Sequence, residues 1–234
     1  MSARPFIHAL HGAPPLVAVS ENLLALADYQ IPAGCALMLR NCAPGGLSKN
    51  GFVWPLTPGA VAVCPDWSPV AACGNGLHGW LWGEGDLQAA GYDIHADCAV
   101  WLVVEVVEAD VVQIERKIKV PSGRVVASGK RHEVCCWLAE RAPGKRVHFG
   151  TATAGYGGTA TAGYRGTATA GDGGTATAGD GGTATAGECG SISVRWWDGR
   201  RQRYRLLVAE VGENGIEANN AYCVVDGKFV AVKP

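Results

Sequence analysis

The sequence has no excess of charge of either sign and no long apolar run, and these absences exclude several classes of protein. Its 234 residues hold 20 Lys and Arg against 21 Asp and Glu, so the formal net charge is −1. Binding to nucleic acid or to an anionic membrane needs a basic face. The one local basic run, residues 195–205, is short and is better explained as one face of a hairpin. No stretch approaches 18 apolar residues, so we expect no transmembrane helix.

The sequence also lacks the marks of secreted and of nucleotide-binding proteins. The first 15 residues have no basic region followed by an apolar run, which a signal peptide would need. The nine cysteines are odd in number and lie mostly among apolar residues, as is typical of buried thiols in a reducing compartment. The phosphate-binding motif GxxxxGK[ST] is absent, and GxGxxG has no match after a predicted strand. We therefore expect a cytoplasmic protein with no cofactor that contacts neither nucleic acid nor membrane.

A tandem repeat dominates what the sequence does contain. Residues 150–189 are five copies of one octapeptide: GTATAGYG, GTATAGYR, GTATAGDG, GTATAGDG and GTATAGEC. A fixed period indicates that each unit stacks on its neighbours. Eight residues suit one short strand and one tight corner, and the glycines suit a corner because they tolerate positive φ. In a strand, the two threonines of a unit share one face and the two alanines share the other.

The octapeptides predict a short β-solenoid with two units in each coil. Residues 190–194 (GSISV) fit as a sixth, closing strand, with Ile192 and Val194 in the alanine positions. This favours alanine inside and threonine outside. A core of alanine and glycine buries little area, so the stack needs support from flanking domains or a second chain. The alternative is a flexible linker. The outward threonines form a candidate binding surface: Thr151, Thr153, Thr159, Thr161, Thr167, Thr169, Thr175, Thr177, Thr183 and Thr185.

Outside the repeat, the sequence predicts a mainly β fold with an α+β N-terminal domain. Residues 99–107 form the strongest apolar strand, residues 111–120 alternate as one half-buried strand, and residues 131–141 are the best helix. A short helix is also expected at 21–27. Trp54 and Trp67 are expected to be buried.

An antiparallel β cap is expected after the repeat. Asp198-Gly199 and Asp226-Gly227 are signals for two-residue hairpin turns. The predicted organisation is therefore a mixed, mainly β domain over 1–149, a β-solenoid over 150–194 and a β-hairpin cap over 195–234.

The segment CGNGLHGWLWGEGD, residues 73–86, most resembles a chemical site. A nucleophilic cysteine needs a base within hydrogen-bond reach, which His78 could supply to Cys73, with Glu84 and Asp86 as further catalytic candidates. A metal site formed by Cys64, Cys73 and His78 is a second option. The spacings match no established motif, so a Gly-rich turn with packed tryptophans is the third. His8 and His11 are a further, weaker pair of metal candidates.

Two resemblances bear on function. The frame AGYGGTATAGYRGTAT resembles the octapeptide repeat of bacterial ice nucleation proteins, which implies a β-solenoid whose threonine ladders order water. This match covers residues 150–189, and the repeat is far shorter than that of a nucleator. Residues 41–129 (NCAPGG, GFVWP, PDWSP, CGNGLHGWLWGEGD and KIKVPSGRVVASG) are similar to a domain of unknown function in bacterial and phage-derived proteins. That resemblance implies no activity, but implies that octapeptide repeats often follow this domain.

Three functions follow from these observations. The first is a non-enzymatic scaffold or interaction protein that self-associates through the solenoid, with its protein partner unknown. The second is an ice-binding surface formed by the threonines. The third is an enzyme or toxin-like domain centred on Cys73 and His78.

Overall fold

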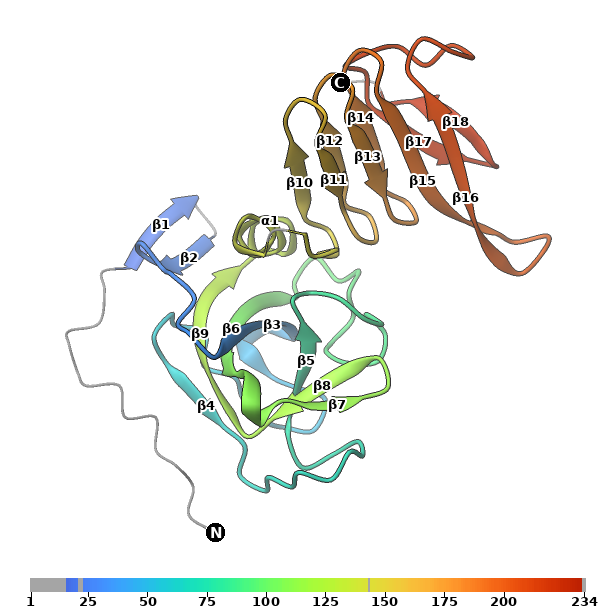
Figure 1. Cartoon of the computed structure of the whole chain (residues 1–234). Helices are drawn as coiled ribbons and strands as arrows, with labels where there is room; N and C mark the ends of the chain where they lie inside the picture. The colour runs from blue at the N-terminus through green and yellow to red at the C-terminus, as the bar shows by residue number, and fades with distance from the viewer. Residues whose placement is uncertain (1–15, 21–22, 143, 233–234) are drawn as a thin grey trace.

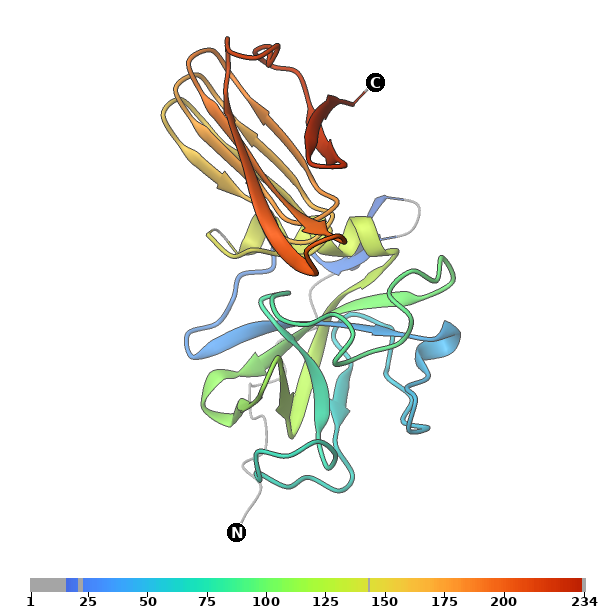
Figure 2. The same cartoon turned by 90° about the vertical axis from the view of Figure 1, so that its right-hand side faces the viewer.

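The computed structural model describes residues 16–20, 23–142 and 144–232, and it shows two β structures joined through one helix (Figure 1). His8 and His11 lie outside the described residues. Helix α1 (Arg131–Arg141) separates the N-terminal sheet from the solenoid in both views (Figures 1 and 2). No helix among the described residues is long and apolar enough to cross a membrane. The prediction of a mainly β fold is confirmed.

The N-terminal part is a strongly curved nine-stranded sheet (Figure 1). Its strands follow the order β1-β2-β9-β6-β3-β5-β8-β7, and β4 also pairs with β9. The strands are β1 (Leu16–Ser20), β2 (Leu23–Leu26), β3 (Cys35–Cys42), β4 (Val61–Val63), β5 (Leu77–Leu81), β6 (Val100–Val107), β7 (Val112–Ile114), β8 (Lys117–Val120) and β9 (Ser122–Gly129). Short 3-10 turns lie at Pro44–Gly46 and Glu108–Asp110.

Both faces of this sheet are covered, which explains the nearly continuous apolar run of β6. Trp101 and Val103 lie in a core that includes Leu138 of α1. Their neighbours Leu102 and Val104 lie in a second core on the opposite face. A strand buried on both faces is apolar at every position rather than at every second one. Within the second core, Trp54 is buried and Trp67 is only partly buried, so the expectation for Trp67 holds in part.

Three local predictions are wrong, two in the N-terminal part and one in the C-terminal cap. Residues 111–120 are a hairpin, β7 and β8, that turns at Glu115, whose φ is 43°. The described residues of the expected helix at 21–27 include strand β2, which pairs with β1 and β9. Tertiary pairing overrides local propensity there. Asp198-Gly199 is not a two-residue turn, because Asp198 pairs with Arg203 across four intervening residues.

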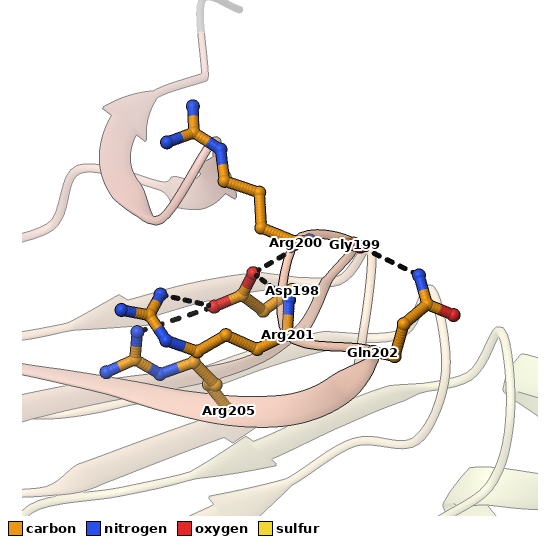
Figure 3. A network of polar contacts seen from close by, with 6 residues as sticks. All are labelled: Asp198, Gly199, Arg200, Arg201, Gln202 and Arg205. Carbon is orange, nitrogen blue, oxygen red and sulfur yellow. Dashed lines mark hydrogen bonds and ion pairs between the residues drawn. The ribbon is translucent and has the colours of Figure 1, made fainter.

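The turn after Asp198 is long because the Asp198 carboxylate organises it (Figure 3). One carboxylate oxygen, Oδ1, accepts hydrogen bonds from the backbone N–H groups of Arg200 and Arg201. The other, Oδ2, pairs with the guanidinium groups of Arg201 and Arg205 at 3.0 and 3.5 Å. The basic run is therefore part of a hairpin, as the sequence predicted.

The octapeptides form a two-sided β-solenoid, as predicted. The strands are β10 (Thr151–Ala154), β11 (Thr159–Thr161), β12 (Thr167–Ala170), β13 (Thr175–Ala178), β14 (Thr183–Ala186) and β15 (Ser191–Asp198). Parallel pairing links β10, β12 and β14 on one side and β11, β13 and β15 on the other. Each residue pairs with the one 16 positions later, as in Thr151 with Thr167. Two units therefore make one coil, and the closing strand is present.

The face assignment is confirmed, because alanine points inward in every unit. Ala168, Ala176 and Ala184 are fully buried, and Ile192 and Val194 continue this interior. The threonines lie on the outside, exposed or half-buried.

Glycine is required where successive coils meet. A Cβ at Gly182 would lie 2.6 Å from the carbonyl oxygen of Gly166 in the coil before. The last residue of each unit has positive φ, and this includes Arg165 and Cys189. The glycines of the repeat thus set the close approach of the coils and the shape of the corners.

Both ends of the solenoid are covered by other elements. At its start, α1 packs beside β10, and the backbone N–H of Phe149 donates to the carbonyl of Tyr164. At its end, β16 (Arg203–Glu210) pairs antiparallel with β15, and β17 (Tyr222–Val225) pairs with β14. β17 and β18 (Lys228–Ala231) form a hairpin through Asp226 and Gly227, both with positive φ. This is the predicted antiparallel cap.

Candidate functional site

The threonines form two regular arrays on opposite sides of the solenoid. Thr face 1 consists of Thr151, Thr153, Thr167, Thr169, Thr183 and Thr185 on β10, β12 and β14. Thr face 2 consists of Thr159, Thr161, Thr175 and Thr177 on β11 and β13, continued by Ser191 and Ser193 of β15. The side chains repeat about every 4.8 Å between strands and about every 6.7 Å along each strand.

The two faces differ in how their hydroxyl groups are used. On Thr face 2, Thr175 Oγ1 lies 3.1 Å from Ser191 Oγ, and Thr177 Oγ1 lies 2.9 Å from Ser193 Oγ. On Thr face 1, the only side-chain hydrogen bond among the described residues joins Thr151 Oγ1 to Cys136 Sγ. Five of the six hydroxyls on Thr face 1 are therefore left for water.

The four catalytic candidates lie in three separate environments. Cys73 is on an exposed turn, where its Sγ accepts a hydrogen bond from Lys117 Nζ at 3.2 Å. His78 is half-buried on β5, and no hydrogen bond joins it to Cys73 in the described part of the chain. The prediction of a Cys73–His78 pair is not supported by this geometry. Burial, with the nearby charges of Lys117, Arg40 and Lys119, lowers the pKa of His78 to about 4.

Glu84 and Asp86 have structural partners at the junction with the solenoid. Glu84 Oε1 accepts a hydrogen bond from the backbone N–H of Arg146, and Asp86 pairs with Arg116 at 3.0 Å. They line a cleft of about 930 Å³ between the N-terminal part and the solenoid. The opposite wall includes Tyr164, whose backbone N–H donates to His148 Nδ1.

His148 bridges the two parts of the molecule at this cleft. Its Nε2 lies 2.9 Å from the carbonyl oxygen of Gly85, and its Nδ1 accepts from Tyr164. These contacts require a neutral ring protonated on Nε2. Burial lowers the pKa of His148, which favours that neutral form. The cleft is thus a structural junction with a fixed geometry.

The suggested metal ligands do not form a metal site. Within the described residues, no three His, Cys, Asp or Glu side chains are grouped so that they could hold a metal ion. Cys64 Sγ donates to Asp66 Oδ1 at 3.1 Å, while Cys73 contacts Lys117. The set Cys64, Cys73 and His78 is therefore wrong as a metal centre. Cys64 and His78 do line one small cavity, together with Arg40.

Comparison with known proteins shows that the chain is similar in sequence to ice nucleation proteins. It is 36% identical over 97 residues to the ice nucleation protein InaU of Pantoea ananas, a match that covers 41% of this chain and 9% of that protein. It is 40% identical over 108 residues to an ice nucleation protein of Pseudomonas syringae, covering 45% of this chain and 9% of the relative. The octapeptides are of the ice-nucleation type. No family model and no solved structure match the chain.

These matches extend beyond the repeat. The aligned stretch of 97 residues is longer than the 40 residues of 150–189, so flanking sequence is similar too. The expectation that the likeness stops at residues 150–189 is wrong. The chain spans less than a tenth of the length of these relatives.

Sequence patterns missed the most unusual polar groups of the N-terminal part. Arg40 on β3 is only 6% exposed and Lys119 on β8 only 1% exposed. Arg40 follows an apolar stretch and Lys119 lies in an alternating one, so the sequence pattern predicts that both side chains point to solvent. The available signal was a basic residue within or directly after an apolar stretch: Lys119 lies between Ile118 and Val120, and Arg40 follows an apolar run in LMLRNC.

Proposed function

We propose that this protein orders water and binds ice through Thr face 1, without enzymatic chemistry. The observation that carries the proposal is the array of six threonines in a strict 16-residue register, with five hydroxyls left for water. A rigid, repeated array of methyl and hydroxyl groups holds water molecules at repeated positions. The similarity to ice nucleation proteins supports the same proposal.

Thr face 1 is favoured over Thr face 2 for two reasons. All three of its strands carry threonine, whereas serine replaces threonine on the last strand of Thr face 2. Ser191 and Ser193 also bond to the threonine hydroxyls beside them. These bonds compete with water. Six threonines make a small surface, so we expect ice binding rather than efficient nucleation by a single chain.

Lysine at Thr167 and Thr169 should remove most of the ice binding. Two long charged side chains in the middle of Thr face 1 would interrupt the flat array, and their ammonium groups would bind water in positions that do not match the array. The matched control is lysine at Thr175 and Thr177, the equivalent pair on Thr face 2. Partition of the full chain into growing ice measures the effect. Wild-type protein that stays entirely in the liquid would overturn the proposal, and equal loss in both variants would overturn the choice of face.

Self-association through β16 is a second candidate function. β16 is the edge strand of its four-stranded sheet, and alternate side chains of it are exposed and apolar. Tyr204, Leu206 and Val208 are 45%, 59% and 58% exposed, on one face of the strand. An exposed apolar edge strand is a template for pairing with another chain. Antiparallel pairing of two copies about Leu206 would place Tyr204 opposite Val208 of the second copy, an aromatic and β-branched pair.

Arginine at Leu206 should convert the assembly to monomer. Two arginines would face each other at the two-fold axis, and like charges directly opposite destabilise a strand pair. Light scattering on a sizing column measures the mass at micromolar concentration. Val70→Arg is the control, since Val70 is equally exposed on a loop of the N-terminal part. A wild-type monomer would rule out this function and leave the ice-binding proposal intact.

A further inference from the structure

The N-terminal part buries the positive charge of Arg40, and no carboxylate among the described residues pairs with it. Arg40 is 6% exposed, yet no ion pair within 4 Å involves it among the described residues. One terminal nitrogen donates to the carbonyl oxygen of His78 at 3.2 Å, and the guanidinium lies over the Trp54 ring. Its Nε is buried and makes no hydrogen bond. A buried charge is costly unless a partner of opposite charge or a full set of hydrogen bonds offsets the lost water.

A second buried cation lies on the neighbouring strand pair. Lys119 is 1% exposed, and its Nζ donates to the backbone carbonyls of Ala72 and Gly74 at 3.0 and 3.1 Å. Lys119 on β8 is the backbone register partner of His78 on β5. The Nε2 atom of His78 is also buried without a hydrogen bond. Lys119 forms no ion pair either within the described residues. This corner of the fold therefore carries a concentrated positive field.

A cavity opens beside these groups. Its volume is about 190 Å³, and its walls include Arg40, His78, Asn50, Asn75 and Trp54. Asp66 is the one carboxylate among the described residues that line it, and it is exposed at the rim. Both of its oxygens already accept hydrogen bonds, from Cys64 Sγ and Asn75 Nδ2. The cavity thus combines a buried guanidinium, the amide of Asn50 and an aromatic wall.

We propose that this cavity binds a compact oxyanion, the carboxylate or phosphate group of a small molecule. An anion beside Arg40 would supply the missing negative charge, and planar guanidinium groups suit carboxylate and phosphate because they donate two parallel hydrogen bonds. The volume matches about six water molecules at about 30 Å³ each, which suits a single small acid and excludes a nucleotide. Trp54 and Leu77 provide apolar contact for a short carbon skeleton.

Thermal melts of the full chain with phosphate or with acetate, at constant ionic strength against chloride, test the proposal. At ten times the dissociation constant, the bound anion should raise Tm by about 3–6 °C. Arg40→Met should abolish this rise. It removes the charge without leaving a carboxylate unpaired, so we expect it to fold. A response to phosphate alone or to acetate alone identifies which kind of oxyanion the cavity accepts.

Two further variants keep the test decisive. Arg116→Met removes an arginine of the same sheet that pairs with Asp86 at the surface, and it should keep the full wild-type rise in Tm. Asn50 lines the cavity from an exposed turn, so Asn50→Trp should fold and should fill the cavity entrance. This variant replaces Arg40→Met in the test if Arg40→Met does not fold. General stabilisation by phosphate acts on every variant alike. The proposal is overturned if neither anion raises the wild-type Tm above chloride, or if the blocked or charge-free cavity responds as the wild type does.

Discussion

Replacing Ala168 with leucine should lower the free energy of unfolding by about 1–3 kcal/mol. Ala168 is fully buried between the two sides of the solenoid, and it pairs in register with Ala152 and Ala184. The interior holds only small side chains on these strands, so three extra carbons force the coils apart. For a chain of this length, each kcal/mol shifts Tm by about 2–4 °C. Ala160, buried on the other side, should behave in the same way.

Thr167→Val is the matched control for this prediction. Thr167 is next to Ala168 but faces outward, and valine keeps the β-branched shape that suits a strand. The change removes one hydroxyl that has water as its partner, so its cost should stay within about 0.5 kcal/mol. Thermal melts of the two variants compare the faces directly. A leucine variant that melts like the wild type would show that the interior yields more easily than its alanine packing indicates.

The solenoid could be predicted from sequence because every level of its structure repeats. Threonine and alanine alternate with period two, glycine returns at each corner, and every Tyr, Arg, Asp, Glu or Cys between Gly150 and Gly190 falls at a corner position. The local strand, the corner and the 16-residue register all agree with one architecture, and such agreement is what makes a fold predictable. The closing strand could also be predicted, because Ile192 and Val194 occupy the positions that alanine has in the repeat.

The N-terminal part was less predictable because its strands depend on distant partners. The chain reverses at Glu115 and Arg116, although the alternation of residues 111–120 continues through them. Strand β2 forms beside β9, about 100 positions later in the sequence, and nothing local to Leu23–Leu26 indicates that pairing. Periodicity shows which residues are buried, but not where a strand ends or what covers it.

The candidate site was misjudged because nearness in sequence was taken for nearness in space. Trp82, Gly83 and Gly85 have positive φ, so the chain turns sharply after β5. Glu84 and Asp86 therefore face the solenoid while His78 faces Arg40 and Cys64. The apolar stretch before Arg40 was a signal that this side chain is buried, but its lack of an ion-pair partner could not be predicted. It depends on the absence of a carboxylate around the folded side chain, which only the structure shows.

Glu105 is the buried carboxylate of the N-terminal sheet, and it does have its partners. It is 2% exposed on β6, where Oε2 accepts hydrogen bonds from Tyr29 Oη at 2.6 Å and from Arg124 at 2.8 Å. Burial, and the hydrogen bond to Glu105, raise the pKa of Tyr29, so its hydroxyl stays protonated and remains a donor.

Arg124→Met should therefore be among the most destabilising single changes in this chain. It leaves the Glu105 carboxylate buried with only Tyr29 as partner, and breaking a buried pair from one side costs about 3–5 kcal/mol. The lower end applies here, because the Arg124 side chain is 33% exposed and water weakens the pair. We expect Tm to fall by at least about 6 °C. The triple variant Tyr29→Phe, Glu105→Leu, Arg124→Met removes the whole network and should regain most of the loss, because no charge is left unpaired. If Arg124→Met alone melts like the wild type, solvent already neutralises Glu105. If the triple variant is as unstable as the single one, the cost lies in packing rather than in charge.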